Sequence, residues 1–249
     1  MTDWKLKEGE RLDDLVRDGM KLIQRPDQFC FSIDSVLLAH YPQIRARDRI
    51  VDLGTGTGVI SLLASALGGK DITAIEVNPV MADLARRNVS GNHKEGIIHV
   101  LEADYREAGK YFPSGSFSLV FVNPPYREVG SGRMSESHGI ASASYELNAT
   151  LEEVFKTSQY LLKYGGRMAM VHRADRLADL ISIGRKYGME PKRLRLIYAR
   201  KGHHAVRVLL EWKYGGHAEL AIEPPLLLHH PDGSYTDEVL AIYGKESNE

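Results

Sequence analysis

The four residues Asn123-Pro124-Pro125-Tyr126 combine groups that can hold a flat, nitrogen-bearing molecule. The side-chain oxygen of Asn123 and the carbonyl oxygen of Pro124 are two acceptors for the two N–H groups of a planar amine. The prolines fix the backbone here, because proline has a restricted φ angle and no N–H. Tyr126 adds an aromatic face on which a flat substrate can stack. Taken alone, this pattern would also suit a proline-rich turn after a strand.

A glycine loop lies within residues 50–60, which read Ile-Val-Asp-Leu-Gly-Thr-Gly-Thr-Gly-Val-Ile. An apolar start typical of a buried strand leads into Gly54, Gly56 and Gly58, and then into an apolar helical pattern. Glycine lets the backbone turn tightly and lets a ligand approach it closely. Strand, glycine loop and helix together form the first unit of a doubly wound α/β sheet, although a lone glycine loop occurs in many folds.

Two acids accompany this loop. Asp52 precedes it, and Glu76 ends the next apolar segment, residues 72–75. The Asn-Pro-Pro-Tyr motif ends a later apolar segment, residues 117–122. Since ligands bind at the carboxyl ends of the strands in open α/β sheets, we expect these groups to lie together. The Asp-Leu-Gly-x-Gly-x-Gly order differs from the G-x-G-x-x-G of dinucleotide enzymes.

Further elements must position these groups. Asn78 and Pro79 have the residue types of a helix N-cap and first helical position, and Ser32 or Asp34 can cap an earlier helix. Residues 127–144 are rich in glycine and serine and predict a mobile loop beside the site. We predict strands at 20–24, 97–101, 167–172, 194–198 and 206–212, the last two as a hairpin, and helices at 11–16, 36–41, 151–162, 176–187 and 236–243.

The length of 249 residues predicts one α/β domain, 1–249, with a core at 46–215, an N-terminal extension at 1–45 and a tail at 216–249. The single cysteine, Cys30, permits no internal disulfide and suits a reducing cytoplasm. No apolar run is long enough to span a bilayer, and the N-terminus has no apolar signal core. We therefore expect a cytoplasmic protein away from membranes, and we favour a monomer.

The net charge is −1, so any nucleic-acid binding must come from a local patch. Residues 185–207 contain eight Lys and Arg against one acid, Glu190. Such a stretch suits phosphate binding, and a solvated charged face is the alternative. His203-His204 lacks further ligands at suitable spacing, so we expect no metal. The candidate substrate contacts are Arg127, Arg133, Arg193, Arg195, Arg200, Lys201 and Arg207.

In their order and spacing these motifs resemble those of class I S-adenosylmethionine (SAM) methyltransferases. The resemblance implies a doubly wound, mostly parallel, seven-stranded Rossmann-like sheet with an antiparallel last strand. Asn123 to Tyr126 resemble the catalytic motif of enzymes that methylate a planar nitrogen. The lone pair of such an amine is delocalised, and acceptors for its two N–H groups favour a nitrogen whose lone pair points at the sulfonium methyl. Positioning then supplies much of the catalysis.

The same resemblance implies the cofactor site. The glycine loop would lie under the methionine part of SAM, Glu76 would hold the ribose hydroxyls, and Asp104 would accept the adenine amino group with Tyr105 beside the ring. The N-terminal extension would cover the cofactor, with Phe31 and Asp34 near it; a plain core and capping role for those two is the alternative. The full set is Gln24, Phe31, Asp34, Asp52, Gly54, Thr55, Gly56, Gly58, Glu76, Val77, Asp104, Tyr105 and Asn123.

Over nearly its whole length the chain resembles bacterial adenine-N6 methyltransferases that act on A37 in the anticodon loop of valine tRNA, members of the small-domain methyltransferase group. Besides the two main motifs, residues 11–15, 31–38 and 232–236 carry this resemblance. It implies an RNA partner, with tRNA favoured. Ser144-Tyr145 stands where an Arg-His pair is expected, and this departure puts the RNA substrate in question.

Other functions stay open at this point. Release-factor methyltransferases modify a protein glutamine and share the Asn-Pro-Pro-Tyr motif. Their N-terminal substrate-binding domain has no counterpart in the 45 or so residues before the first strand of this core. An rRNA guanine-N2 methyltransferase and a non-catalytic SAM- or RNA-binding module are further alternatives.

Overall fold

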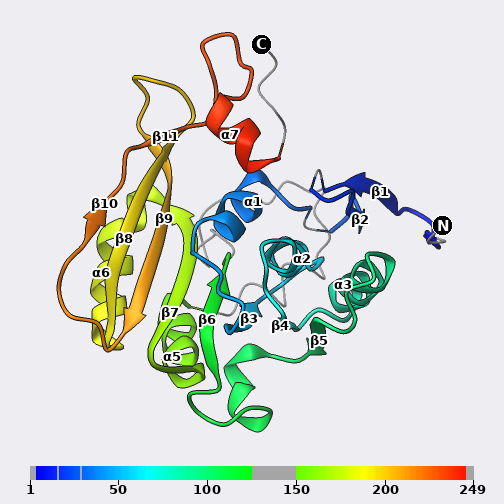
Figure 1. The fold of residues 1–249 in the computed structure, drawn as a ribbon, viewed down its shortest axis with the longest axis horizontal. Helices are drawn as coiled ribbons and strands as arrows, with labels where there is room; N and C mark the ends of the chain where they lie inside the picture. Colours follow the sequence, from blue (N-terminus) through cyan, green and yellow to red (C-terminus); the bar gives the residue numbers. More distant parts are fainter. Residues whose placement is uncertain (1–3, 16, 29, 125–149, 245–249) are drawn as a thin grey trace.

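The computed structural model describes residues 4–15, 17–28, 30–124 and 150–244 (Figure 1). The strands are β1 (Arg11–Asp14), β2 (Lys21–Gln24), β3 (Arg49–Leu53), β4 (Asp71–Glu76), β5 (Ile98–Glu102), β6 (Phe117–Val122), β7 (Leu162–Arg173), β8 (Met189–Tyr198), β9 (Ala205–Tyr214), β10 (Ala221–Ile222) and β11 (Leu226–Leu227). The helices are α1 (Ile33–His40), α2 (Val59–Ala66), α3 (Pro79–Gly91), α5 (Leu151–Leu161), α6 (Leu177–Lys186) and α7 (Asp237–Ile242), with short 3-10 turns η1 (Tyr105–Lys110) and η2 (Ala174–Arg176).

The main sheet has the order β10-β8-β9-β7-β6-β3-β4-β5. Strands β3 to β7 run parallel, and β9 lies antiparallel between β7 and β8. The predicted doubly wound α/β class with an antiparallel last strand is confirmed. Seven long strands form the predicted sheet, and the two-residue strands β10 and β11 extend it along β8. These short pairings explain why the described part of the sheet counts nine strands.

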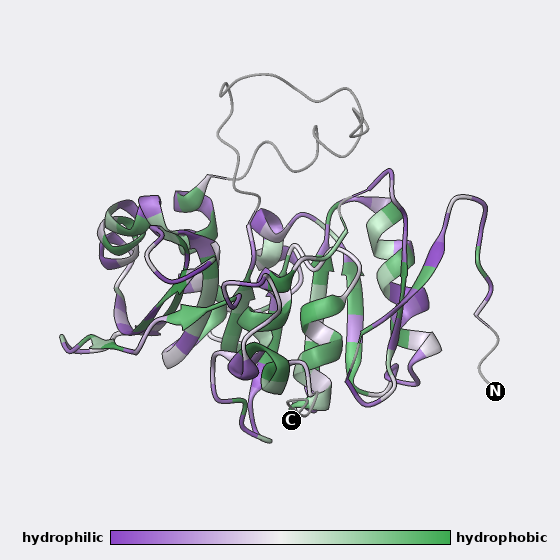
Figure 2. Ribbon diagram, turned by 90° about the horizontal axis from the view of Figure 1, so that it is seen from above, coloured by the Kyte–Doolittle hydropathy of each residue, from purple (hydrophilic) through white to green (hydrophobic). Residues whose placement is uncertain are grey.

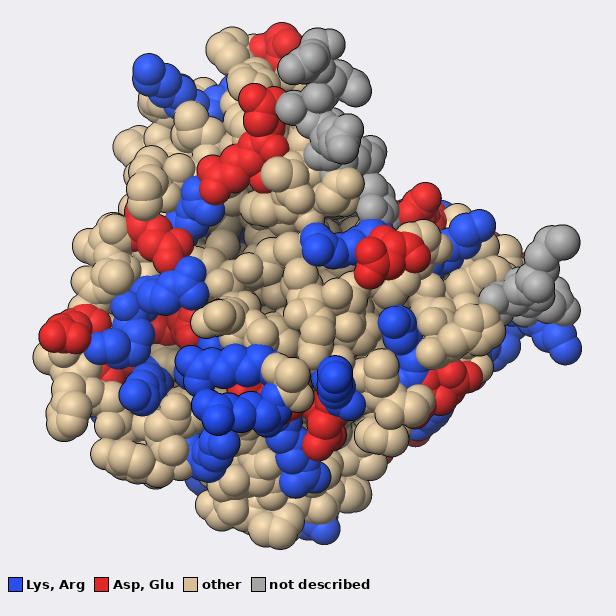
Figure 3. Space-filling view, in the orientation of Figure 1, with Lys and Arg blue, Asp and Glu red and all other residues tan. Residues whose placement is uncertain are grey.

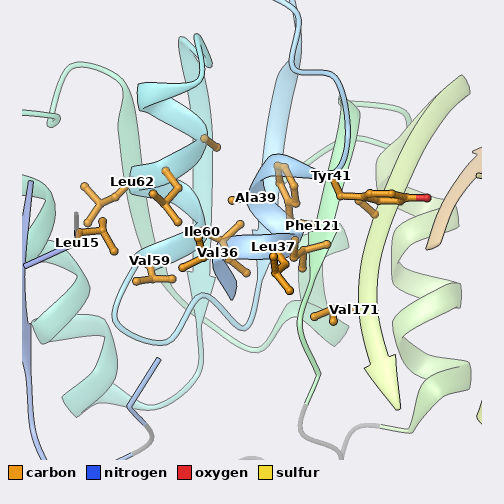
Figure 4. Close-up of a cluster of buried hydrophobic side chains, with 14 of the residues drawn as sticks. Leu15, Val36, Leu37, Ala39, Tyr41, Val59, Ile60, Leu62, Phe121 and Val171 are labelled. Atoms are coloured by element: carbon orange, nitrogen blue, oxygen red, sulfur yellow. The ribbon is translucent and has the colours of Figure 1, made fainter. Parts of the chain in front are cut away.

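Helices cover both faces of the sheet, because each central strand presents apolar side chains on both sides. On one face Ile50 and Phe121 pack with α1, α2 and α7, and Figure 4 shows Leu37 of α1 beside Phe121 of β6. On the other face Val51 and Val120 pack with α5 and α6. Figure 2 shows this pattern as hydrophobic colour along the central strands and hydrophilic colour toward the periphery.

The helix starts follow local sequence rules. Ser32, not Asp34, is the N-cap of α1, since its hydroxyl accepts from the backbone N–H of Asp34 at 3.3 Å. Asn78 caps α3 and Pro79 takes the first helical position, as predicted. Thr150 and Glu153 form a capping box at the start of α5. The cap at Asn78 fixes the turn from the parallel strand β4 into α3.

The helix predicted at residues 11–16 is wrong. Residues Arg11–Asp14 form strand β1, which pairs antiparallel with β2 in a separate two-stranded sheet. Leu12 lies opposite Ile23 in this pairing and packs beside Met81 and Leu84 of α3. Tertiary contacts of this kind override a weak helical pattern. Figure 1 shows the hairpin beside α3, away from β8 and β9.

Among the described residues, no helix has the length and apolar character needed to cross a bilayer.

Candidate active site

The groups predicted to act together follow three neighbouring strands. Leu53 at the end of β3 pairs with Ile75 of β4 on one side and with Val122 of β6 on the other. Gly54, Glu76 and Asn123 therefore emerge at one edge of the sheet. The chain winds from β3 toward β5 in one direction and from β6 toward β8 in the other, so this edge is the topological switch point where open α/β sheets bind ligands.

The glycine loop is shaped for close approach by a ligand. Gly54, Gly56 and Gly58 have φ angles of 70°, 60° and 87°, a region that side chains strongly disfavour. The backbone N–H groups of Gly54 and Thr55 both donate to the carbonyl of Ile75, at 2.9 and 3.0 Å. A Cβ atom added at Gly54 would meet nothing within 4 Å, so the space beside this glycine is open, whereas one added at Gly56 would lie 3.6 Å from Met81.

Glu76 braces this loop from the end of β4. One carboxylate oxygen accepts from the N–H of Gly56 at 2.8 Å, and the other accepts from the N–H of Asn78 at 2.9 Å. Burial raises the pKa of Glu76, and the backbone hydrogen bonds oppose that shift. The backbone N–H of Val77 adds a third hydrogen bond to this carboxylate, and its remaining acceptor capacity suits a ribose hydroxyl of SAM.

Asp52 lies fully buried below the loop. Its Oδ2 accepts from the hydroxyls of Thr55 at 2.5 Å and Ser61 at 2.9 Å. Burial raises the pKa of Asp52 to about 6, against the lowering effect of these two hydrogen bonds, and Glu76 raises it further. Its Oδ1 has no hydrogen-bond partner among the described residues. A buried acceptor without a partner beside an open glycine loop fits a cofactor with donor groups.

Asn123 is oriented by a residue of α1. Its Nδ2 donates to the hydroxyl of Ser35 at 3.1 Å, and Ser35 is itself buried. With the amide nitrogen directed at Ser35, the amide oxygen is the end suited to accept from a substrate N–H. Pro124 follows within the described chain. Several predicted features lie outside the described residues: the catalytic residues Pro125 and Tyr126, the substrate contacts Arg127 and Arg133, the loop 127–144 and the pair Ser144-Tyr145.

Hydrogen bonds join the residues of the N-terminal extension that are predicted to cover the cofactor. Gln24 is almost completely buried, donates to the carboxylate of Asp13 and accepts from the N–H of Phe31 at 2.9 Å. Asp34 accepts from Nε of Arg207 at 2.9 Å. Phe31 packs at the margin of the core cluster that contains α1 and α2. Because Ser32 caps α1, the capping alternative for Asp34 is wrong. The position of Phe31 fits its core alternative, and the cofactor role of both residues stays a prediction.

Asp104 follows β5 and caps the turn η1. It accepts from the N–H of Arg106 at 2.9 Å, and the Arg106 guanidinium bonds both of its oxygens. Burial works against ionisation, but the hydrogen bonds from Arg106 leave the pKa of Asp104 below its usual value. Tyr105 is part of the core cluster with α5, and burial raises its pKa. Val77 is half-exposed between Glu76 and the start of α3.

Three of the predicted substrate cations form ion pairs. Arg193 contacts Glu211 at 2.8 Å and Glu223 at 2.7 Å. Arg195 contacts Glu238 at 2.6 Å, and Arg207 contacts Asp34. The remaining two, Arg200 and Lys201, are exposed in the turn between β8 and β9 and form no ion pair with any residue of the described ranges. Since β9 begins opposite the end of β7, this turn projects from the same sheet edge as the glycine loop.

Two contributors were missed from the sequence. Ser35 orients Asn123, and Ser61 bonds Asp52. Both are polar residues within otherwise apolar, buried helices, which is the signal that could have identified them. No group of three or more His, Cys, Asp or Glu residues suited to a metal ion occurs in the described ranges.

Comparison with known proteins gives consistent findings. A family profile described as methyltransferase small domain matches residues 31–180. A protein of Photobacterium profundum named tRNA1(Val) (adenine(37)-N6)-methyltransferase is 24% identical, over 85% of this chain and 88% of its own. One of the same name from Porphyromonas gingivalis is 28% identical, over 77% of this chain and 76% of its own. An Agrobacterium tumefaciens structure described as a predicted O-methyltransferase superposes with a TM-score of 0.65 at 25% identity, covering 85% of this chain and 95% of that one.

Proposed function

Because this chain belongs to the methyltransferase small domain family and is a SAM-dependent methyltransferase, we propose that its acceptor is the N6 amine of an adenine in tRNA. The relatives named for adenine-37 methylation of valine tRNA align over most of both chains, which supports this acceptor. The proposal includes action in the cytoplasm, as a single domain and a monomer.

The observation that carries the proposal is the orientation of Asn123. It stands at the end of β6, next to the glycine loop, with its amide nitrogen held by Ser35. The amide oxygen of Asn123 and the carbonyl of Pro124 are two acceptors that suit the two N–H groups of a planar amine. An oxygen nucleophile has no such pair of N–H groups, so this arrangement favours nitrogen over the oxygen acceptor that the description of the Agrobacterium protein implies.

When bound, S-adenosylmethionine supplies an activated methyl group. The residues of the chain hold the amine so that its nitrogen lone pair points at that methyl carbon. With Glu76 and the glycine loop holding the cofactor, Asn123 and Pro124 would present the nitrogen to the methyl group, and S-adenosylhomocysteine would be the leaving group. The resulting charged nitrogen is acidic, so its proton can pass to water and no strong base is required. Catalysis then rests mainly on position, which well-aligned sites exploit strongly.

Replacing Asn123 by alanine tests the assigned role. We expect Asn123→Ala to lower methyl transfer to tRNA by at least a hundredfold, because alanine offers no acceptor for the amine. SAM affinity should stay within about threefold of the wild type, since Glu76 and the glycine loop are unchanged. Single-turnover rates and calorimetric SAM binding give the two values. Turnover near the wild-type rate in the variant would overturn the role of Asn123.

A further inference from the structure

Asn88 of α3 and Asn92, the C-cap residue of that helix, bind one edge of strand β2. The Oδ1 of Asn92 accepts from the N–H of Lys21 at 3.0 Å, and its Nδ2 donates to the carbonyl of Lys21 at 2.7 Å. The Oδ1 of Asn88 accepts from the N–H of Ile23 at 2.6 Å, and its Nδ2 donates to the carbonyl of Ile23 at 3.1 Å. Each carboxamide therefore satisfies both backbone groups of one strand residue, as a neighbouring strand would.

The spacing of the two elements makes this double contact possible. Residues four apart on a helix lie on one face, about 6 Å apart along its axis. Residues two apart in a strand direct their backbone groups to the same side and are about 6.7 Å apart. The two spacings are close enough for Asn92 to bond Lys21 while Asn88 bonds Ile23. The α3 segment is therefore a second partner of β2, on the side opposite β1.

Of the two, only Asn88 makes its third contact with the glycine loop. Its Nδ2 also donates to the carbonyl of Thr57 at 3.0 Å, and Thr57 lies inside the glycine loop. The Asn88 side chain is completely buried. Its carboxamide hydrogens and oxygen therefore join the loop to β2 without water between them. By contrast, Asn92 bonds Lys21 and the backbone of its own helix.

Apolar contacts also join β2, α3 and the glycine loop. Ile23 packs against Met81, and a Cβ atom added at Gly56 would lie 3.6 Å from the end of the Met81 side chain. Gln24 follows Ile23 and holds the N–H of Phe31. A shift of β2 therefore reaches both the loop and the segment that leads into α1.

We propose that Asn88 is a positioning residue for SAM binding: it fixes the N-terminal hairpin and the glycine loop in one arrangement that is competent to bind the cofactor. Other contacts hold the far part of the N-terminal segment. Glu10 pairs with Arg87, and the Trp4 ring lies against Gly91. Loss of Asn88 should therefore loosen the junction at the loop without releasing the whole segment.

Asn88→Ala tests this inference, with Asn92→Ala as the matched control on the same helix. We expect SAM affinity to fall about tenfold in Asn88→Ala, because a buried carbonyl and two strand groups lose their partner. The kcat at saturating SAM should stay within about twofold, since no group that faces the acceptor is altered. Asn92→Ala should bind SAM within twofold of the wild type, because its carboxamide does not reach the loop.

Two results would overturn the inference: a folded Asn88→Ala variant with wild-type SAM affinity, or equal losses in both variants. A measurement on the unaltered protein applies even if Asn88→Ala does not fold. Because coupling is reciprocal, SAM should slow hydrogen exchange at the Ile23 amide together with Gly56. Unchanged exchange at Ile23 on SAM addition would contradict the coupling. SAM affinity and hydrogen exchange both report on cofactor binding. A failure of this inference is therefore distinguishable from a failure of the proposed acceptor.

Discussion

At the scale of single residues, the amide that we propose binds the acceptor is oriented by a neighbouring side chain. Ser35 accepts from the nitrogen of Asn123 and so selects which end of the amide faces the acceptor. Without this hydroxyl, either end of the amide can face the site. The misdirected form presents N–H groups to the N–H groups of the amine, which repel one another.

We therefore expect Ser35→Ala to lower the kcat for methyl transfer about tenfold while SAM affinity stays unchanged. Ser65→Ala is the control, because Ser65 is also a buried helix serine but bonds only the carbonyl of Leu62 within α2. Steady-state kinetics on the RNA substrate measure the effect. A wild-type kcat in Ser35→Ala would show that the amide needs no such support.

The buried carboxyl of Asp52 makes a prediction about pH. Its pKa is raised to about 6 in the folded protein and is near 3.8 when unfolded, so the folded state binds the extra proton between those values. The contribution of Asp52 to stability is therefore present below about pH 4 and is lost as the pH rises through 6. Two pKa units correspond to about 3 kcal/mol.

Asp52→Asn removes this titration and keeps an oxygen for Thr55 and Ser61. Relative to the wild type, we expect the free energy of unfolding of Asp52→Asn to increase by up to about 3 kcal/mol between pH 4 and pH 7. Urea unfolding of both proteins across that range gives the difference between their free energies of unfolding. The other titratable groups are the same in both proteins, so their contributions cancel in this difference. A difference that does not change with pH would contradict the raised pKa.

At the scale of elements, the turn from β3 into α2 depends on a left-handed residue. Gly58 caps α2 with a φ of 87°, and a Cβ there would lie 3.5 Å from Ala85, which is an ordinary contact. We expect Gly58→Ala to cost about 1 kcal/mol of stability through backbone strain alone and to weaken SAM binding by moving the loop. Urea unfolding and SAM titration provide the test.

Gly96→Ala is the matched control, since Gly96 is exposed, has open space at its Cβ position and does not have a positive φ. Gly96→Ala should leave both the free energy of unfolding and the SAM affinity unchanged. Equal stability losses at the two positions would mean that the left-handed cap is not the cause.

Sequence patterns located most of these elements because their hydrophobic spacing agrees with the final fold. The apolar segment at residues 117–122 coincides with β6, since this strand is buried along its whole length and ends at a proline motif. Residues 11–16 were misplaced because β1 is stable only through β2 and α3, which no local pattern reveals. For the same reason Ser35 and Asn88 were missed, as their roles arise from contacts across 88 and 65 residues of sequence.

At the scale of the whole molecule, basic residues that are close in the sequence differ in their surroundings in the fold. On the face in Figure 3, Lys and Arg side chains gather low on the left with acidic side chains among them. Arg193 belongs to a network in which buried Glu211 also contacts Arg167, and Arg167 contacts Asp48. Such a network is costly to break, because removing one member leaves a buried charge unpaired.

We expect the double variant Arg200→Ala/Lys201→Ala to bind tRNA more weakly and to lower the slope of log affinity against log salt by about one to two, with unchanged stability. Arg193→Ala should instead lower stability, because buried Glu211 loses one of its two arginine partners while Arg167 remains. Filter binding at several salt concentrations, together with urea unfolding, separates the two outcomes. A normal salt slope in the double variant would exclude this turn from the RNA contacts.

The central claim is methyl transfer to an adenine of tRNA, and one experiment tests it most directly. The protein is incubated with labelled SAM and total RNA from bacteria that lack the corresponding activity, and the RNA is digested to nucleosides that are identified by mass. We expect label in N6-methyladenosine from the tRNA fraction, absent with Asn123→Ala. Label on guanine or in rRNA would contradict the proposed acceptor while leaving the fold and the cofactor site in place, and no label in RNA would contradict it as well.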